Sequence, residues 1–370
     1  TVPAICIPQF AESIFGICSR KFNENFGITN DFKICRNERK LVMKLAKGDK
    51  VAIVCCSNGQ SLSKKKEIEN LKVILEEMGL ISVFSKYIYQ KISLEEVENN
   101  LKGFPESGSP LEKARELMEF YEDASIKAIF DISGGDLANT ILPYLDYERI
   151  ASVKKQFCGY SDLTTIINAI YAKTQKVSVL YQIRNLLYEY SAQQKEDFIK
   201  TCFAKDLNNI INNDAVKMME KNNLYDLSVE NSGLYQFPYK FYQGKTVEGI
   251  VVGGNIRCFL KLAGTEYFPD VTDKILLLEA RSGNLAQIVT YFAQLEQLGV
   301  FKKVKGILLG TFTQMEREQP VPAVYSLLKR YINEELPVVK TEYIGHGEDS
   351  KAIQIGNCLL YTSPSPRDRG

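Results

Sequence analysis

The sequence contains a single histidine, His346, and this residue limits the acid–base chemistry that the chain can perform. It lies in the run YIGHGED, where glycines on both sides let the backbone approach a ligand closely. Its position just after an apolar run indicates an exposed loop. Because the pKa of histidine lies near neutrality, it is the usual base for activating a hydroxyl. A lone histidine can also be purely structural, but any Ser–His mechanism in this chain must use His346.

Ser161, in the stretch FCGYSDLT, is a candidate nucleophile. A short apolar segment precedes it, and the run TIINAIY with helical spacing follows it, so we expect a strand-to-helix turn. The stretch departs from the G-x-S-x-G elbow because Leu163 replaces the second glycine. The amide of Asp162, at the start of the next helix, would point to where an oxyanion develops. A serine at this place can equally well cap the helix, so the motif alone leaves both interpretations open.

Glu279 is a candidate for orienting the histidine, because it ends the apolar run KILLLEA. An ionised carboxylate at such a position is costly unless it is paired, which favours a partner. The alternative is a strand-end glutamate that faces water. A second oxyanion donor could come from the loop ISGGDL, where Gly134 and Gly135 allow close backbone approach.

The overall composition argues against several classes of function. The chain has 46 Lys and Arg against 45 Asp and Glu and no long run of one sign. This balance disfavours a dedicated nucleic-acid or membrane-surface protein. No apolar stretch approaches the roughly 20 residues that cross a bilayer, and the first residues lack the pattern of a secretory signal. The nine cysteines show no paired metal spacing and indicate reduced thiols in a cytoplasmic protein.

Alternating strand and helix patterns predict an α/β domain over residues 43–190 that carries the nucleophile. Apolar runs at 51–55, 81–85, 127–131 and 177–181 have the length of buried strands, with helical segments between them. This alternation predicts a doubly wound, mostly parallel sheet covered on both faces. In such sheets the functional loops follow the carboxyl ends of the strands, where ISGGDL and GYSD both fall.

The remaining residues divide into a connector, a second domain and two ends. Residues 191–230 predict a helical connector, and residues 231–357 predict a smaller, strand-rich, mixed α/β C-terminal domain with helices at 284–298 and 321–333. Residues 1–42 precede the first methionine and show no clean period, so we expect a non-native or disordered extension. The run CLLYTSPSPRD resembles one reading frame of a sequencing-library adapter, so we expect residues 358–370 to be an adapter-derived or disordered tail.

Six motifs occur in an order that is more specific than any one of them: FDISGGDLANTILPYLDY, FCGYSDLTTIINAIY, VVGGNIRCFLKLAGTEYFPD, KILLLEARSG, GILLGTF and YIGHGED. Together they resemble the LD-carboxypeptidase family of serine peptidases, which also includes the microcin C self-immunity peptidases. The resemblance covers nearly everything from Met43 to Gly356. It implies that the first domain carries the nucleophile and the second domain the glutamate and the histidine.

Residue by residue, the resemblance implies Ser161 as the nucleophile, Glu279 as the triad acid, His346 as the base, and the amides of Asp162 and Gly135 as the oxyanion hole. We also expect Gly134 and Asn255 to contact the substrate. The resemblance implies no metal or organic cofactor. We expect a homodimer that acts on small peptides and contacts neither nucleic acid nor membrane.

The sequence departs from the family pattern around the pocket. Many members have an Arg-Gly-Gly-Tyr-type loop at residues 133–136, a His-Gly-Pro at residues 181–183, and an acid where this chain has Ala280. The expected reaction is hydrolysis of the bond between an L-configured centre and a terminal D-amino acid, in murein peptides released during cell-wall recycling. The departures leave two alternatives open. One is a self-immunity peptidase that cleaves a peptidyl-nucleotide amide such as microcin C, and the other is a non-catalytic cleft that binds small peptides.

Overall fold

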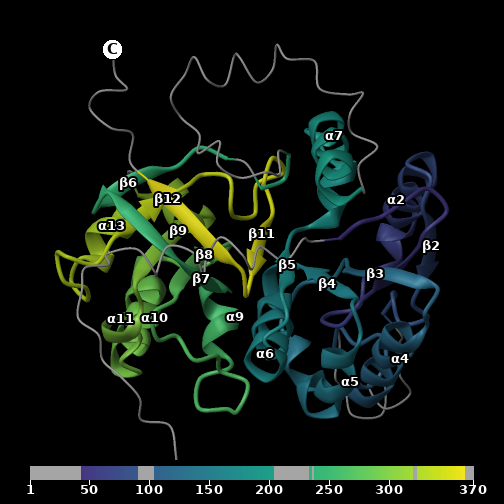
Figure 1. Cartoon of the computed structure of the whole chain (residues 1–370), viewed down its shortest axis with the longest axis horizontal. Coiled ribbons are helices and arrows are strands. Elements are labelled where there is room, and N and C mark those ends of the chain that lie inside the picture. The colour runs from purple at the N-terminus through teal and green to yellow at the C-terminus, as the bar shows by residue number, and fades with distance from the viewer. Residues whose placement is uncertain (1–42, 91–103, 204–232, 236, 320–322, 363–370) are drawn as a thin grey trace, which may run out of the picture. The chain divides into compact units, whose positions relative to one another are not determined.

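The computed structural model describes residues 43–90, 104–203, 233–235, 237–319 and 323–362, which all belong to one compact unit of the chain. These residues form two six-stranded sheets with helices packed on them (Figure 1). The predicted fold class is confirmed, because the first sheet is mostly parallel and the second is a mixed α/β layer. None of the helices in these ranges is long and apolar enough to span a membrane.

The first sheet has the strand order β11-β5-β4-β3-β1-β2. Five of its strands pair in parallel: β1 (Lys50–Val54), β2 (Ile81–Phe84), β3 (Ile126–Asp131), β4 (Gln156–Gly159) and β5 (Ser178–Leu180). The chain runs outward from β1 to β2, then returns to the other side of β1 and continues through β3, β4 and β5. In this doubly wound order, the loops after the strands meet at one edge, on both sides of the point where the direction changes.

Both faces of the first sheet are covered, because successive strand residues point to opposite sides. In β1, Ala52 and Val54 belong to one buried cluster, whereas Val51 and Ile53 belong to the other. The helical segments of this part are η1 (Leu62–Lys64), α2 (Lys65–Glu77), α4 (Pro110–Glu122), η2 (Ala138–Tyr144), α5 (Tyr147–Ser152), η3 (Ser161–Leu163), α6 (Thr164–Thr174), η4 (Ile183–Leu187) and α7 (Ser191–Cys202). Helix α4 begins at a capping box between Ser109 and Glu112, with Pro110 at its first position.

The second sheet has the strand order β12-β7-β8-β9-β10-β6. Its four central strands are parallel, and β6 and β12 close the two edges in antiparallel pairing. The strands are β6 (Lys240–Gln243), β7 (Thr246–Asn255), β8 (Ile275–Ala280), β9 (Gly306–Phe312), β10 (Val338–Lys340) and β12 (Cys358–Thr362). The helices are α9 (Ile256–Leu260), α10 (Leu285–Gln297), α11 (Val300–Lys303), α12 (Thr313–Glu318) and α13 (Ala323–Leu328).

The two sheets share a continuous hydrophobic core. Ile166 and Ile170 of α6 belong to the same buried cluster as Val251 of β7 and Ile275 and Leu277 of β8. The opposite face of the second sheet packs in a separate cluster under its own helices. The two predicted domains are therefore joined by packed side chains, which fixes the elements of one relative to those of the other.

Three features of the C-terminal part differ from expectation. Strand β11 (Ile353–Ile355) leaves the second sheet and pairs antiparallel with β5 of the first. Residues 358–362, expected in an adapter-derived or disordered tail, form β12 beside β7, so these five positions are not disordered. Their apolar and β-favouring side chains explain this, because Tyr361 is buried in the shared core. Helix α13 ends at Leu328 rather than near residue 333.

Several expectations fall on residues outside the described ranges. The connector predicted at 191–230 is seen only as α7 and the bridge residue Phe203. Residues 1–42 and 363–370, for which we expected an extension and a tail, also lie outside.

The helix predicted at 284–298 is present as α10, and Asn284 forms a capping box with Gln287.

Candidate active site

Ser161 lies on a sharp turn between β4 and the helical segment that follows. Its φ is +59°, a left-handed conformation that is uncommon for a residue other than glycine. The turn is so tight that a Cβ at Gly159 would lie 2.7 Å from the Cβ of Leu163. The N-caps of η3 and α6 are Tyr160 and Leu163, so Ser161 caps neither helix. The strand-to-helix turn expected at this serine is present, and its backbone has the strained conformation that is common at functional sites.

The molecule has two lobes: the first is built on the sheet that contains β1 to β5, and the second on the sheet that contains β6 to β10. His346 links these lobes through its two ring nitrogens. Its Nε2 lies 3.1 Å from Ser161 Oγ, and its Nδ1 lies 2.8 Å from Glu279 Oε2. Because an ionised carboxylate can only accept, the Glu279 contact places the ring proton on Nδ1. Nε2 is then left as an acceptor directed at the serine hydroxyl. The structure thus brings His346 together with Glu279 and Ser161, which lie 67 and 185 positions before it in the sequence.

Glu279 is wholly buried in β8, where an unpaired charge would be strongly destabilising. The hydrogen bond to His346 satisfies one of its oxygens. Tyr160 packs edge-on against the His346 ring, with the ring centroids 5.0 Å apart. Burial, and then the negative charge of Glu279, raises the pKa of Tyr160, so this side chain stays a neutral phenol.

The loop that carries His346 is held closely against the end of β9. The amide of Thr311 donates to the carbonyl of Ile344 over 2.8 Å, and a Cβ at Gly345 would lie 1.7 Å from Thr311 Oγ1. Only glycine therefore fits beside the histidine at this distance. From the other lobe, Gln194 of α7 donates to the carbonyl of Ser350 over 3.0 Å. Both lobes consequently fix the position of the imidazole.

The loop after β3 lies against the nucleophile. A Cβ built on Gly134 would be 3.8 Å from Ser161 Oγ, which is ordinary van der Waals contact. The backbone of Gly134 therefore lies next to the serine hydroxyl. Gly135 has a φ of +122°, and the side chain of Asn58 occupies the space that a Cβ there would need. Asn58 Oδ1 also accepts from the amide of Asp136 over 3.0 Å. This arrangement agrees with an oxyanion role for the Gly135 and Asp162 amides, which stays a prediction.

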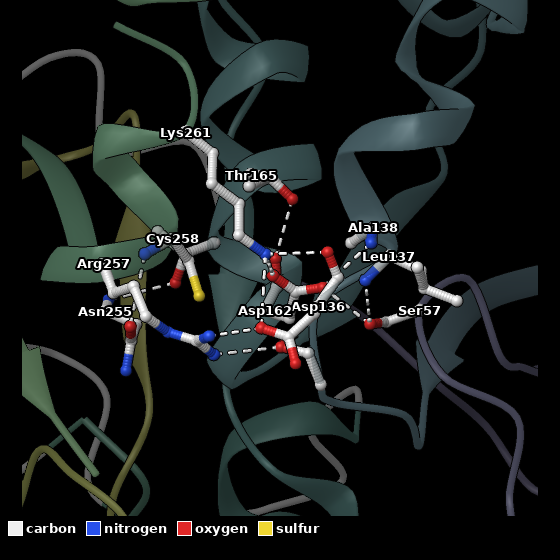
Figure 2. Close-up of polar contacts among 12 residues, drawn as sticks. Ser57, Asp136, Leu137, Ala138, Asp162, Thr165, Asn255, Arg257, Cys258 and Lys261 are labelled. Carbon is white, nitrogen blue, oxygen red and sulfur yellow. Dashed lines mark hydrogen bonds and ion pairs between the residues drawn. The ribbon is translucent and has the colours of Figure 1, made fainter. Parts of the chain in front are cut away.

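The side chain of Asp162 is the centre of a polar network that joins the lobes (Figure 2). It is fully buried, and its Oδ2 accepts from Ser57 Oγ over 2.6 Å and from the amide of Ala138 over 2.8 Å. Its Oδ1 pairs with Lys261 Nζ at 2.5 Å, and the same ammonium donates to the carbonyl of Asp136 over 2.9 Å. The residue after the nucleophile is thus fixed by groups from the loop after β1, the loop after β3 and the second lobe.

Arg257 of α9 reinforces the same loop from the second lobe. Its guanidinium pairs with the Asp136 carboxylate and donates to the carbonyl of Gly135 over 3.1 Å. We did not anticipate Arg257 or Lys261 from the sequence. The carboxylate of Asp162 beside the candidate nucleophile was a usable signal, because a buried acid there requires a cation or several donors.

Asn255, expected to contact the substrate, acts as the N-cap of α9. Its Oδ1 accepts from the amide of Cys258 over 3.3 Å, and its own amide donates to Thr164 Oγ1 over 3.1 Å. The residue is 5% exposed. It therefore links the second lobe to the start of α6, and its substrate contact stays a prediction, as does that of Gly134.

A cavity of about 520 Å³ opens beside His346. Its walls are formed by Tyr160, by residues of η4 and its two ends, by the segment around His346, and by Arg281 together with residues of α12. This volume lies within the roughly 300–1,000 Å³ of small-molecule pockets. The histidine that contacts Ser161 is accordingly exposed to a space of ligand size.

The buried cysteines near the site do not compete as nucleophiles. Burial, with a smaller contribution from Asp131, raises the pKa of the Cys55 thiol to about 12. Burial also raises the pKa of Cys158, three residues before Ser161. Because the thiolate is the reactive form, both side chains remain unreactive thiols near neutral pH.

Comparison with known proteins places this geometry in a family. The model of the LD-carboxypeptidase N-terminal domain matches residues 51–182, and that of the LD-carboxypeptidase C-terminal domain matches residues 248–359. The chain belongs to the LD-carboxypeptidase family. It is therefore a serine-type peptidase by family, and the predicted resemblance is confirmed.

Individual relatives of this LD-carboxypeptidase family member include two proteins of Bacillus subtilis (strain 168). YocD, a carboxypeptidase by name, is 28% identical over 325 residues, which cover 85% of this chain and 93% of the relative. A murein peptide carboxypeptidase by name is 25% identical over 315 residues, or 84% and 88% of the two chains.

The microcin C7 self-immunity protein MccF of Escherichia coli is also similar, with 27% identity over 271 residues, which cover 68% of this chain and 76% of MccF. The structure of MccF in complex with aspartyl sulfamoyl adenosine superposes with a TM-score of 0.70 at 25% identity, covering 87% of this chain and 95% of that one.

Proposed function

We propose that this protein hydrolyses the amide bond between an L-configured centre and a terminal D-amino acid in murein peptides, with Ser161, His346 and Glu279 as its catalytic triad. The observation that carries the proposal is the position of His346, which lies 3.1 Å from Ser161 Oγ and 2.8 Å from Glu279 Oε2. These distances lie within the range over which a general base takes a proton from a hydroxyl.

In the first half of the reaction, Ser161 Oγ attacks the substrate carbonyl carbon while His346 Nε2 takes the hydroxyl proton. Glu279 stabilises the imidazolium that forms and holds it in the required orientation. The amides of Asp162 and Gly135 donate to the oxyanion of the tetrahedral intermediate. When the carbon–nitrogen bond breaks, His346 gives its proton to the leaving amine, and the acyl group stays on the serine as an ester.

The second half returns the enzyme to its starting state. Water replaces the departed amine, His346 takes one of its protons, and the hydroxide oxygen attacks the ester carbonyl. The same two amides hold the second oxyanion. Cleavage of the ester then gives the proton back to Ser161 Oγ and releases the shortened peptide as a carboxylic acid.

The relatives support the choice of murein peptides, because YocD is named as a carboxypeptidase and another relative as a murein peptide carboxypeptidase. The similarity to MccF, solved with an aspartyl sulfamoyl nucleoside, supports the alternative of a peptidyl-nucleotide amide. A cytoplasmic homodimer that recycles cell-wall peptides stays a prediction in either case.

Turnover separates these proposals. Purified protein would be incubated with a murein tetrapeptide ending in D-alanine and, separately, with a peptidyl-nucleotide amide, and the products identified by mass spectrometry. We expect release of D-alanine by the wild type and no release by Ser161→Ala. Cleavage of the nucleotide conjugate alone would favour the self-immunity activity. Binding of a peptide without cleavage of either compound would leave only a non-catalytic cleft.

A further inference from the structure

We propose that the cavity beside His346 binds the carboxylate of the leaving amino acid, and that Arg281, assisted by Arg317, recognises it. The inference rests on the proposed peptidase function and deepens it by naming the residues that recognise the free carboxylate of the terminal amino acid. It would make the enzyme a carboxypeptidase by charge recognition rather than by the size of the pocket.

The side of the site on which the cavity lies identifies the part of the substrate that it takes. In a serine mechanism the histidine donates its proton to the leaving amine, so the leaving group must lie next to the imidazole. The cavity is lined by His346 and by both glycines that flank it. Gly134 and Gly135, on the oxyanion side of Ser161, do not line it. The cavity therefore lies on the leaving-group side of the scissile bond.

Arg281 is placed in this cavity by the strand that carries the triad acid. It follows the last residue of β8, two positions after Glu279, and it is one of the residues that line the cavity. Gln314 of α12 holds the turn from both ends. Its amide donates to the carbonyl of Arg281 over 3.1 Å, and its Oε1 accepts from the amide of Gly283 over 2.9 Å. The backbone that presents Arg281 is thus held in place before substrate arrives.

Arg317 approaches the same cavity from α12. It stands four positions after Thr313, so both side chains lie on one face of this helix and both line the cavity. Neither Arg281 nor Arg317 has a carboxylate within 4.0 Å among the residues that the structure describes. Two arginines therefore line the cavity without an ion-pair partner among the described residues, and arginine is well suited to bind a carboxylate through two parallel hydrogen bonds.

The other charged groups of the cavity each have at least one partner, although the Nε of Arg184 is buried without one. Arg184 donates to Gln60 Oε1 over 3.3 Å and lies 4.0 Å from Glu67. Glu318 accepts from Gln314 Nε2 over 2.8 Å, and Glu348 accepts from the amide of Glu189 over 3.0 Å. The two acids keep the cavity from being uniformly positive, so a single small anion fits it better than a polyanion.

Kinetics on a matched pair of substrates test the proposal. One peptide ends in D-alanine with a free carboxylate, and the other is the same peptide with a C-terminal amide. We expect the wild type to cleave the acid with a kcat/KM roughly 10- to 100-fold higher, the range that a hydrogen-bonded charge contact supplies. Arg281→Gln should lose most of this preference by slowing cleavage of the acid alone, Arg317→Gln should lose less, and Arg281→Lys should keep part of it.

Arg115→Gln is the matched control, because Arg115 is an exposed arginine on α4 that does not line the cavity. It should keep the full preference. As a second measurement, calorimetry of the Ser161→Ala protein with both peptides should show tighter binding of the acid, and the additional Arg281→Gln change should remove the difference. Arg281 is exposed, so thermal unfolding of its variants should match that of the wild type.

The outcomes separate this inference from the proposed function. If the wild type cleaves acid and amide equally well, or if Arg281→Gln slows both equally, the carboxylate site is wrong and the peptidase function stands. If only a peptidyl-nucleotide amide is cleaved and its turnover depends on Arg281, the cavity binds an anion other than a terminal carboxylate, and the proposal is overturned. If the wild type and Ser161→Ala cleave the same compounds equally well, or if neither cleaves any, the function and the inference fail together.

Discussion

Replacing Lys261 with methionine removes the cation that pairs with the buried Asp162 while keeping a side chain of similar length. Asp162 is fully buried, and Lys261 is 18% exposed, so the 2.5 Å contact between them is shielded from solvent. Breaking such a pair from one side costs about 3–5 kcal/mol, because the remaining charge is left buried without its partner. Asp162 keeps two donors, Ser57 Oγ and the amide of Ala138, which places the expected loss near the lower end, about 3 kcal/mol.

Equilibrium unfolding in urea measures this loss, and a second lysine provides the control. Lys173 pairs with Glu266 at 2.8 Å between α6 and the loop before β8, but Lys173 is 32% exposed and Glu266 is 66% exposed. Lys173→Met should therefore leave the free energy of unfolding unchanged. Adding Asp162→Asn to Lys261→Met removes the unpaired charge and should recover much of the stability. Equal losses for the two lysine variants, or no loss for Lys261→Met, would refute the reasoning.

Three further changes have defined outcomes. Glu279→Gln should lower kcat by about 10³–10⁴-fold with little change in KM, because an amide no longer fixes the proton on Nδ1 of the imidazole. Steady-state kinetics that show a loss of less than about tenfold would contradict the role of Glu279 as the triad acid. Gly345→Ala should lower kcat by on the order of 10²-fold, because its Cβ must displace the histidine loop from Thr311; unchanged kcat would contradict the close approach. Tyr361→Ala should reduce the free energy of unfolding by about 3 kcal/mol, because its ring packs 4.2 Å from that of Tyr239, and urea unfolding that matches the wild type would show that β12 is not part of the core.

The parallel strands were predictable because their signals are local. The strands β1, β3 and β5 are short apolar runs followed by turn residues, and each lies within one residue of its expected bounds. Ser161, Glu279 and His346 stood out for the same reason, since each follows or ends such a run. Their meeting in space was expected from the family resemblance, and the structure brings them within hydrogen-bonding distance.

Contacts between distant segments were not predictable from local pattern. Strand β11 has only three residues, and nothing in them indicates pairing with β5 rather than with the second sheet. The run at 358–362 was assigned to an adapter-derived or disordered tail from its resemblance to an adapter reading frame, which carries no information on pairing with β7. No local pattern marked Lys261, because its partner Asp162 lies 99 positions away and its burial depends on how the lobes pack.

The most direct test of the central claim compares the rates of Ser161→Ala, His346→Ala and the double variant on a murein tetrapeptide. If Ser161 and His346 act as one unit, each single change removes nearly all the acceleration that the pair provides, on the order of 10⁴- to 10⁶-fold. The double variant should then be no slower than either single variant. Losses that multiply in the double variant, or a His346→Ala protein that keeps most of its activity, would contradict the assignment of these residues to one catalytic triad.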